Sequence, residues 1–332
     1  MSYKKQTHSG NKIEVSIIIP TFKSRKTIEK CLHSLIKQNY PKQKYEIIVV
    51  DNFSKDGSKE IAKKFKKVKF IEKKSNPAEA RNYGAKLAKG SVLLFIDSDC
   101  IAPRNWIRLM TKNLKDNVVG VCGVYRNLNK DSIVSRYIQG EIEYRHKKLF
   151  HKKEIDSIGT YSAAYRRDVF LKFGGFDERF AKASGEDFDL SYRLKEAGYK
   201  LVLEPRAYVW HFHVKTLWKY LKQQFIRAYW RVLLYKKHPK KIIGDSYTGK
   251  FIPLFAFFMI FFWLSLLLVF VSILPPYLPI LFLLGFYLLN IKFILYLIKK
   301  EKKMLIFAPP IIFLRTVVCL LGFFWGVIKI KR

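Results

Sequence analysis

Short apolar runs alternate with amphipathic stretches through the first part of the chain. Four runs have the length and composition of buried strands: 15–19, 45–50, 68–71 and 92–96. Three stretches between them carry apolar residues at helical spacing: 27–38, 58–66 and 78–89. Strands that alternate with helices are typical of a mainly parallel sheet, and ligands bind where the carboxyl ends of its strands meet. The pattern therefore predicts an α/β fold with a binding site at that edge.

Two aspartates follow the fourth apolar run directly. Asp97 and Asp99 stand two positions apart, so in an extended backbone both carboxylates point to the same face. Paired carboxylates suit a Mg²⁺ or Mn²⁺ ion that also binds phosphate oxygens. The alternative is that Asp97-Ser98-Asp99 only caps a following helix, and the tripeptide by itself does not separate the two interpretations.

Beyond Cys100 the alternation is less regular. Helical spacing returns at 106–115 and 132–148, with an extended stretch at 118–125 between them. A further helix begins at the acidic residues Glu186 and Asp187 and ends near Gly198, because glycine commonly follows the last helical turn. The stretch 199–214 has the pattern of a strand and a loop, and it contains His211 and His213.

Three long apolar stretches dominate the last eighty residues: 251–274, 277–298 and 304–328. Each exceeds the roughly 20 residues that a helix needs to cross a bilayer. The third contains Pro309, Pro310 and Arg315, which weaken it as a span. We therefore expect a membrane protein with at least two transmembrane helices, at 251–274 and 277–298.

The charge balance indicates an anionic partner. The chain has 62 Lys and Arg against 26 Asp and Glu, a formal net charge of +36, which favours nucleic acid, anionic lipid or a phosphorylated substrate. Lysines flank both ends of the hairpin 251–298, so the positive-inside bias predicts that both ends are cytoplasmic. The tail 329–332 is also basic, which favours an interfacial or re-entrant helix at 304–328 over a third crossing. The aromatic and basic stretch 215–241 is predicted to be an interfacial helix on anionic lipid.

Six motifs in a fixed order point to one family. They are residues 15–22, residues 49–58, Ala80-Arg81-Asn82, Asp97-Ser98-Asp99, Gly174-Gly175-Phe176-Asp177-Glu178 and Glu186-Asp187-Phe188-Asp189-Leu190. Over about residues 13–245 the chain resembles the family 2 glycosyltransferases. The resemblance implies the glycosyltransferase A fold, a mixed but mainly parallel sheet between helices. We assign residues 1–12 to a disordered arm and 13–214 to the catalytic domain.

The resemblance also implies the reaction and the residues that perform it. Such proteins transfer a sugar from a nucleoside diphosphate sugar with inversion, using Mn²⁺ or Mg²⁺. Matching motifs assign Asp187 as the catalytic base, supported by Glu186. The matching motifs assign the metal site to Asp99, Asp97 and His211. They assign binding of the nucleotide sugar to Pro20, Thr21, Asp51, Arg81, Asp97 and Ser98.

Each of these assignments has a structural alternative. Asp51 and Asp56 also fit a turn and a helix cap. Glu186 and Asp187 also fit favourable acids in a first helical turn. A histidine such as His211 is commonly structural. Arg81 either contacts phosphate bidentately or pairs on the surface with Glu79 or Glu72.

We predict a non-processive transferase that adds one sugar to a polyprenyl-linked or other glycan acceptor at the cytoplasmic membrane face. One alternative is a processive polysaccharide synthase. Processive members carry Gln-x-x-Arg-Trp, whereas here two residues separate Arg227 from Trp230 after Gln224, which argues against that alternative. The other is a membrane-tethered scaffold or nucleic-acid binder. Acidic residues gather at the predicted strand ends, so we expect no nucleic-acid partner.

Overall fold

The structure is a computed structural model, and it describes residues 12–182, 184–245, 247 and 252–330. The arm predicted at 1–12 therefore lies outside the described residues, apart from Lys12. The chain forms two compact units. The first comprises Met1–Val124, Gly159–Phe176 and Glu204–Val209, and the second comprises Tyr125–Ile158, Asp177–Leu203 and Trp210–Arg332.

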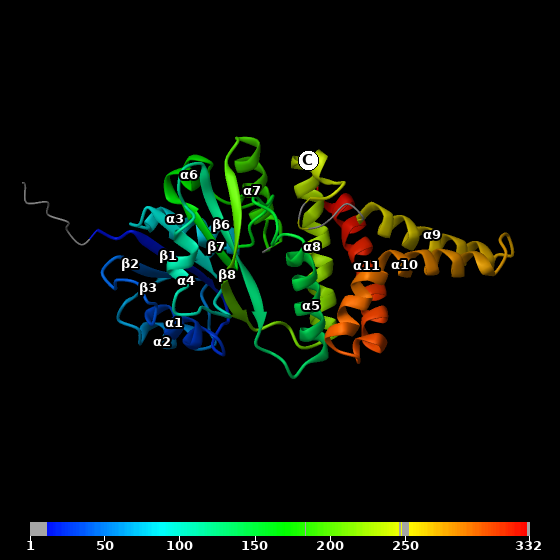
Figure 1. Cartoon of the computed structure of the whole chain (residues 1–332), viewed down its shortest axis with the longest axis horizontal. Helices are drawn as coiled ribbons and strands as arrows, with labels where there is room; N and C mark the ends of the chain where they lie inside the picture. The colour runs from blue at the N-terminus through cyan, green and yellow to red at the C-terminus, as the bar shows by residue number, and fades with distance from the viewer. Residues whose placement is uncertain (1–11, 183, 246, 248–251, 331–332) are drawn as a thin grey trace, which may run out of the picture. The chain divides into compact units, whose positions relative to one another are not determined.

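One eight-stranded sheet organises the α/β part, in the order β3-β2-β1-β4-β7-β6-β8-β5 (Figure 1). Its strands are β1 (Val15–Thr21), β2 (Tyr45–Asp51), β3 (Val68–Glu72), β4 (Val92–Ile96), β5 (Cys100–Ile101), β6 (Val118–Asn127), β7 (Ser162–Arg166) and β8 (Lys200–His211). Strands β1 to β4 pair in parallel, whereas β7 runs antiparallel to both β4 and β6. The predicted mixed, mainly parallel sheet is confirmed.

Among its described residues, the first unit has five α-helices: α1 (Ile28–Ile36), α2 (Ser58–Lys63), α3 (Pro77–Leu87), α4 (Trp106–Thr111) and α6 (Arg167–Lys172). Helix α3 begins with a capping box, in which Asn76 and Glu79 satisfy each other's backbone N–H groups. It packs closely on β1, because a Cβ placed at Gly84 would lie 2.5 Å from Ile18 Cγ2. The first three helices confirm the predicted amphipathic stretches.

The second unit contains the other α-helices of the described residues: α5 (Ile133–Lys147), α7 (Glu186–Glu196), α8 (Leu217–Lys237), α9 (Ile252–Phe270), α10 (Tyr277–Lys300) and α11 (Met304–Lys329). Helices α9 and α10 lie side by side as a hairpin (Figure 1). Helix α8 lies against α11. Added Cβ atoms at Gly322 and Gly326 would come within 2.4 and 2.6 Å of the backbone oxygens of Phe225 and Tyr229, so both glycines are needed for this approach.

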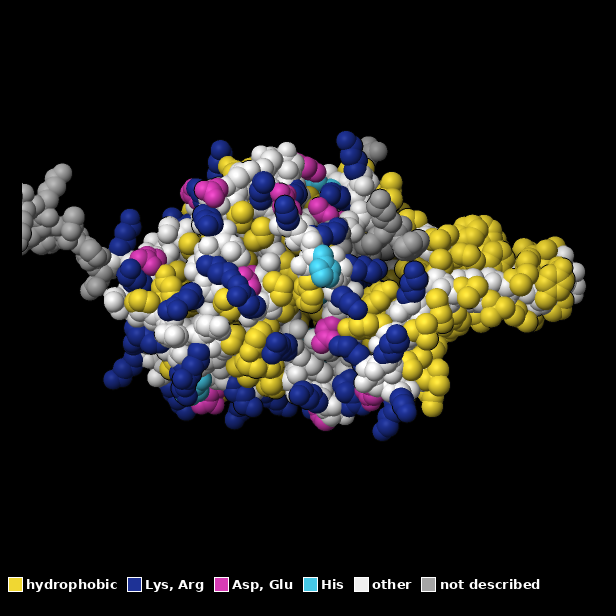
Figure 2. All heavy atoms as spheres, viewed as in Figure 1, with side chains coloured by type: hydrophobic (Ala, Val, Ile, Leu, Met, Phe, Trp, Pro, Cys, Tyr) yellow, Lys and Arg dark blue, Asp and Glu magenta, His cyan; other side chains and the backbone are white. Residues whose placement is uncertain are grey.

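Three of these helices, α9, α10 and α11, are long and apolar enough to cross a membrane. Large apolar side chains cover the α9–α10 hairpin (Figure 2), and Phe270 and Leu288 remain 86% and 68% exposed. Exposed apolar surface of this extent is unfavourable in water. The helices therefore fit the predicted apolar segments at 251–274, 277–298 and 304–328.

A buried carboxylate on β8 provides a test of how the first unit is stabilised. The Glu204 side chain is 7% exposed and accepts hydrogen bonds from Lys112 Nζ at 2.5 Å and Arg206 Nε at 3.0 Å. Burial raises the pKa of Glu204, but the bonds from Arg206 and Lys112 outweigh burial and lower it to about 2. A carboxylate whose pKa is depressed by folding stabilises the protein above its ordinary pKa, and this contribution is lost as the pH falls toward 2.

We expect Glu204→Gln to lower the free energy of unfolding by about 1–3 kcal/mol at pH 7, because two cationic donors lose their charged acceptor. The difference from wild type should shrink between pH 4.5 and 2, where the wild-type carboxylate gains a proton. Thermal unfolding of the detergent-solubilised protein, from pH 7 down to pH 2, measures the loss of stability and its dependence on pH. Asp168→Asn is the control, because Asp168 pairs with Arg166 while 65% exposed, and exposed pairs contribute little. A difference for Glu204→Gln that stays constant down to pH 2 would contradict the ion-pair explanation.

Candidate active site

The ends of three parallel strands bring the first group of predicted residues to one edge of the sheet. In the register of β1 and β2, Pro20 lies opposite Val50 and Thr21 lies opposite Asp51. Asp97 follows the last residue of β4. Strand β4 pairs with the edge of β1 that faces away from β2. The carboxyl ends of parallel strands meet at one edge, which is where this class of sheet binds ligands.

A buried arginine, Arg81, forms an ion pair with the partly exposed Asp97 at this edge. The Arg81 side chain on α3 is 2% exposed and donates from Nη2 to Asp97 Oδ1 at 2.8 Å. Of the two acidic residues considered as alternative partners, Glu79 closes the capping box and Glu72 binds Lys59. Because Asp97 itself keeps 29% of its side chain exposed, Arg81 can orient this carboxylate while a ligand still reaches it.

Hydrogen bonds join the loops that follow β1, β2 and β4. Ser98 Oγ and Ser24 Oγ lie 2.7 Å apart, and the Ser24 backbone N–H donates to Ser58 Oγ at 2.9 Å. The Lys23 backbone N–H donates to Ser54 Oγ at 2.8 Å. The predicted nucleotide-binding residue Ser98 is thereby held in a network of short loops.

Asp51 and Asp56 make the contacts of turn and cap residues. Asp51 is fully buried and accepts from Ser54 N–H and Ser54 Oγ, both at 2.7 Å. Asp56 accepts from Ser58 N–H at 3.1 Å and from Ser58 Oγ at 2.5 Å. Within the described part of the chain, Thr21 Oγ1 is buried with no hydrogen-bond partner. A buried hydroxyl of this kind costs free energy, which a bound ligand at this edge would recover.

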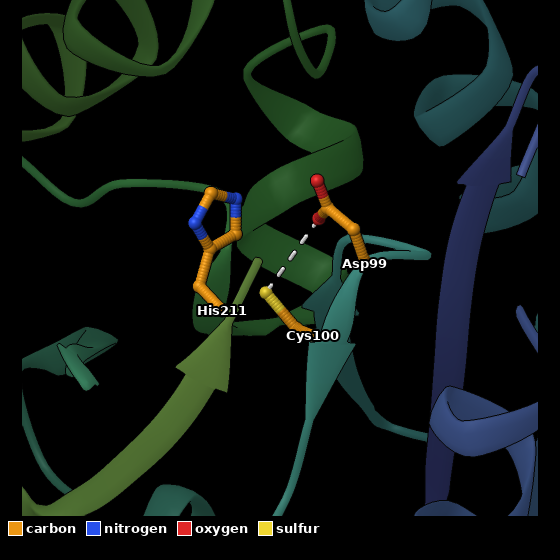
Figure 3. Close-up of side chains that lie close together, drawn as sticks. All are labelled: Asp99, Cys100 and His211. Carbon is orange, nitrogen blue, oxygen red and sulfur yellow. Dashed lines mark hydrogen bonds between the residues drawn. The ribbon is translucent and has the colours of Figure 1, made fainter. Parts of the chain in front are cut away.

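Asp99 and Cys100 lie where β5 begins. Cys100 Sγ donates to Asp99 Oδ1 at 3.9 Å (Figure 3). Burial raises the pKa of Cys100 well above its usual value, and the charges of Asp99 and Asp97 raise it further. Thiol sulfur is a soft ligand, whereas a hard cation such as Mg²⁺ prefers oxygen.

His211, the last residue of β8, belongs to a short chain of hydrogen bonds in the second unit. Its Nδ1 lies 2.8 Å from His213 Nδ1, and His213 Nε2 lies 2.9 Å from Gln139 Oε1. The ring of Tyr125 lies 4.6 Å from the His211 ring, centroid to centroid. His213 is buried. These contacts fix the orientation of the His211 ring, as outer partners do for metal-binding histidines.

The first turn of α7 carries the predicted catalytic pair. Glu186 is buried, and its Oε2 accepts from the backbone N–H groups of Ser184 at 2.8 Å and Gly185 at 3.1 Å. Asp187 Oδ1 accepts from the Phe188 N–H at 2.9 Å, and its side chain is half-buried. Glu186 therefore shapes the entry of the helix, while Asp187 is the more accessible carboxylate.

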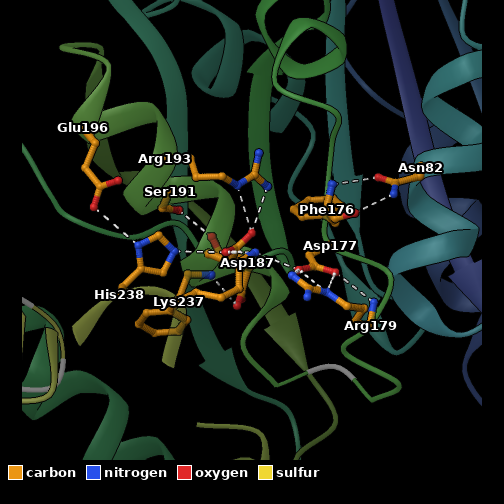
Figure 4. A network of polar contacts seen from close by, with 12 residues as sticks. Asn82, Phe176, Asp177, Arg179, Asp187, Ser191, Arg193, Glu196, Lys237 and His238 are labelled. Atoms are coloured by element: carbon orange, nitrogen blue, oxygen red, sulfur yellow. Dashed lines mark hydrogen bonds and ion pairs between the residues drawn. The ribbon is translucent and has the colours of Figure 1, made fainter. Parts of the chain in front are cut away.

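Asp189, also in the first turn of α7, is the centre of an ion-pair network with Arg193, Lys237 and His238. These three partners are labelled in Figure 4. The fully buried carboxylate of Asp189 accepts from Arg193 Nε at 3.0 Å and from His238 Nε2 at 3.0 Å, and it also contacts Lys237. Lys237 binds Asp177 Oδ2 at 2.7 Å as well. The network connects α7 to the C-terminal end of α8 and so holds the helix that carries Asp187.

Several of these partners were not predicted from the sequence. Arg193, Lys237 and His238 contact Asp189, two residues from Asp187. Gln139 contacts His213, two residues from His211. The spacing of Asp189 and Arg193, four residues apart on one helix, is a signal that sequence reasoning can use. The bond from His213 to Gln139 joins residues 74 positions apart and has no local signal.

A mixed sheet with acidic side chains at the carboxyl ends of its strands is typical of nucleotide-binding α/β folds. The family model described as glycosyl transferase family 2 matches residues 16–174. Glycosyltransferase AglE of Haloferax volcanii is 30% identical over 220 residues, which cover 64% of this chain and 70% of AglE. The chain belongs to glycosyl transferase family 2, and it is a glycosyltransferase.

Two further comparisons extend over nearly the whole chain. A Methanococcus voltae protein is 27% identical over 346 residues, covering 95% of this chain and 97% of its own length. It is named dolichyl N-acetyl-alpha-D-glucosaminyl phosphate 3-beta-D-2,3-diacetamido-2,3-dideoxy-beta-D-glucuronosyltransferase. The mannosyltransferase PcManGT of Pyrobaculum calidifontis, solved with GDP-Man and Mn²⁺, superposes with a TM-score of 0.61 at 18% identity. That superposition covers 96% of this chain and 88% of PcManGT, and it confirms the fold.

Proposed function

We propose that this glycosyltransferase moves one sugar from a nucleoside diphosphate sugar to a polyprenyl-phosphate-linked acceptor at the cytoplasmic membrane face. The observation that carries the proposal is the likeness, over nearly the full length of both chains, to a relative named for a dolichyl-linked phosphate acceptor. The three apolar helices support it, because a soluble acceptor would not require them.

A divalent metal, Mn²⁺ or Mg²⁺, fits the donor atoms that we propose as its site. Asp99 offers a carboxylate directly before β5, and His211 offers a ring nitrogen at the end of β8. We assign Asp99 and His211 as ligands, since carboxylate oxygen and imidazole nitrogen suit these ions better than the soft sulfur of Cys100. Asp97, held by Arg81, completes the predicted set. When bound, the metal would act as a Lewis acid on the diphosphate.

The protein's own side chains would then complete a single displacement. Asp187 takes the proton from the acceptor hydroxyl as the oxygen forms a bond to the anomeric carbon. The bond from that carbon to the diphosphate oxygen breaks, and the nucleoside diphosphate leaves with the electron pair. One displacement inverts the anomeric centre. A carboxylate placed as a general base contributes about 10²–10⁴-fold to such a step.

We expect the labelled sugar to enter the organic phase when membranes containing the enzyme are incubated with labelled nucleotide sugars and then extracted. The reason is that a polyprenyl chain carries its attached glycan into organic solvent. Membranes containing Asp99→Asn are the matched control and should transfer no label.

The length of the extractable product distinguishes this proposal from the processive alternative. A product longer by one sugar supports single transfer, whereas a ladder of lengths supports a polysaccharide synthase. Label that stays wholly in the aqueous phase, with an active enzyme, would overturn the lipid acceptor.

A further inference from the structure

Three helices of the second unit meet at one carboxylate. Glu141 on α5 is 9% exposed at its side chain and accepts from Arg145 Nη2 at 2.5 Å. It also accepts from Arg315 Nη1 of α11 at 3.1 Å and from the Tyr220 hydroxyl of α8 at 3.0 Å. No residue of this cluster belongs to the site described above.

The cluster carries more positive than negative charge. Burial raises the pKa of Glu141, but Arg145 and Arg315 outweigh burial and the pKa lies below its ordinary value. Glu141 is therefore ionised at neutral pH, and it faces two guanidinium groups. Arg227 of α8 adds a further attraction to the same carboxylate. A surplus of cations in such a partly buried cluster is unfavourable unless another anion joins it.

The two arginines keep donors for such an anion. Their side chains are 27% exposed at Arg145 and 26% exposed at Arg315, so a ligand can reach both. Among the described residues, Arg315 Nε is buried without a hydrogen-bond partner. A guanidinium offers five N–H donors in a planar fork that matches phosphate oxygens, and the bonds to Glu141 use only some of them.

The surroundings of the cluster are apolar. Tyr137, Ile311 and Ile312 belong to the buried core formed by α5, α8, α9, α10 and α11, and Leu314, next to Arg315 on α11, is 37% exposed. A phosphate that enters here would be accompanied by apolar contacts along α11. This combination matches an amphiphile with a phosphate head and a hydrocarbon chain better than it matches inorganic phosphate.

We propose that Arg145 and Arg315 bind the phosphate group of the lipid-linked acceptor, with Glu141 holding the two guanidinium groups in position. The inference rests on the proposed lipid acceptor and adds the residues that recognise it. The competing explanation is an ion pair that only joins α5 to α11. Binding measurements, which do not require turnover, separate the two explanations.

Farnesyl phosphate is a suitable probe, titrated against the full chain in nanodiscs of phosphatidylcholine. We expect saturable binding, with farnesol and inorganic phosphate at least about tenfold weaker, since each lacks one of the two recognised groups. Arg145→Gln and Arg315→Lys should each weaken farnesyl phosphate binding by about tenfold or more, because each removes one planar fork. Farnesol that binds as tightly as farnesyl phosphate would overturn the proposal.

Arg136→Gln is the matched control on the same helix. Arg136 makes bidentate hydrogen bonds to Glu301 at 2.8 and 3.0 Å, so it is an arginine of α5 that joins a neighbouring element without belonging to the cluster. It should leave the affinity for farnesyl phosphate unchanged. Equal loss in Arg136→Gln and Arg145→Gln would show a general effect of charge or stability. Thermal midpoints establish that each variant is folded, and Arg145→Gln tests the proposal even if the α11 variant does not fold.

Two further arms identify the source of the phosphate. In nanodiscs that contain phosphatidylglycerol, binding of farnesyl phosphate should persist, whereas its complete displacement would assign the cluster to phospholipid headgroups and overturn the acceptor role. Extractable product without any binding of farnesyl phosphate would refute this site and leave the lipid acceptor standing. Aqueous product together with specific binding would refute the lipid acceptor and, with it, the role assigned to the cluster.

Discussion

Asp99→Asn is expected to abolish sugar transfer in a protein that remains folded. The substitution keeps the size of the side chain but removes a carboxylate from the proposed metal site. A metal acting as a Lewis acid supplies several kcal/mol of transition-state stabilisation, so turnover should fall by about 10³-fold or more. Binding of Mn²⁺, measured by the loss of its free electron paramagnetic resonance signal, should weaken in parallel. His211→Ala should weaken Mn²⁺ binding in the same way.

The control for Asp99→Asn is Asp131→Asn. Asp131 is 67% exposed and pairs with Lys215 at 2.7 Å, so its loss removes one acidic charge at a surface ion pair. Turnover and Mn²⁺ affinity should stay at wild-type values in this variant. A folded Asp99→Asn protein that retains near-wild-type turnover would remove Asp99 from the metal site and would leave the family assignment intact.

The sequence predicted the central strands because parallel strands are buried on both faces. Strands β1, β2 and β4 consist of nearly continuous apolar residues, which is the pattern that such burial requires. Strand β5 has only two residues, too few to produce a pattern. Strand β7 has the sequence Ser-Ala-Ala-Tyr-Arg, whose small side chains give no clear alternation. Its place in the sheet depends on antiparallel pairing with β4 and β6, which is a property of the tertiary structure.

Candidate site residues were predictable where a local motif holds them. Asp97 and Asp99 follow a strand, and Glu186 and Asp187 begin a helix, so their positions follow from nearby residues. Their partners come from distant parts of the chain. Arg81 reaches Asp97 from α3, because Gly84 lets that helix lie close to β1. No spacing rule connects such residues.

Helix α8 shows how a pattern can be interpreted too narrowly. Its aromatic and basic residues predicted an interfacial helix, and Trp218 is indeed 75% exposed. The structure also places α8 against α11, where Gly322 and Gly326 allow close approach of the two backbones. Two glycines four residues apart in an apolar segment are a recognised signal of helix packing. The pair Gly322 and Gly326 could therefore have predicted a helix contact from the sequence. Docking of α8 on anionic lipid remains a prediction.

The second large effect is expected from substitution of Asp187, the proposed catalytic base. Asp187→Asn should lower turnover by about 10²-fold or more, because the amide cannot accept the proton of the attacking hydroxyl. Affinity for the nucleotide sugar should change little, since the proposed role of Asp187 is toward the acceptor. Turnover with saturating donor, together with donor binding measured by calorimetry, separates the chemical step from binding.

Glu196→Gln is the control on the same helix. Its side chain is 62% exposed and lies 3.4 Å from His238, at the far end of α7 from Asp187. Turnover should remain within about twofold of wild type, because an exposed pair contributes less than about 1 kcal/mol. If Asp187→Asn instead abolishes donor binding while bound donor still reacts at the normal rate, Asp187 belongs to the donor site. The base must then be sought among the other carboxylates near the first turn of α7, beginning with Glu186.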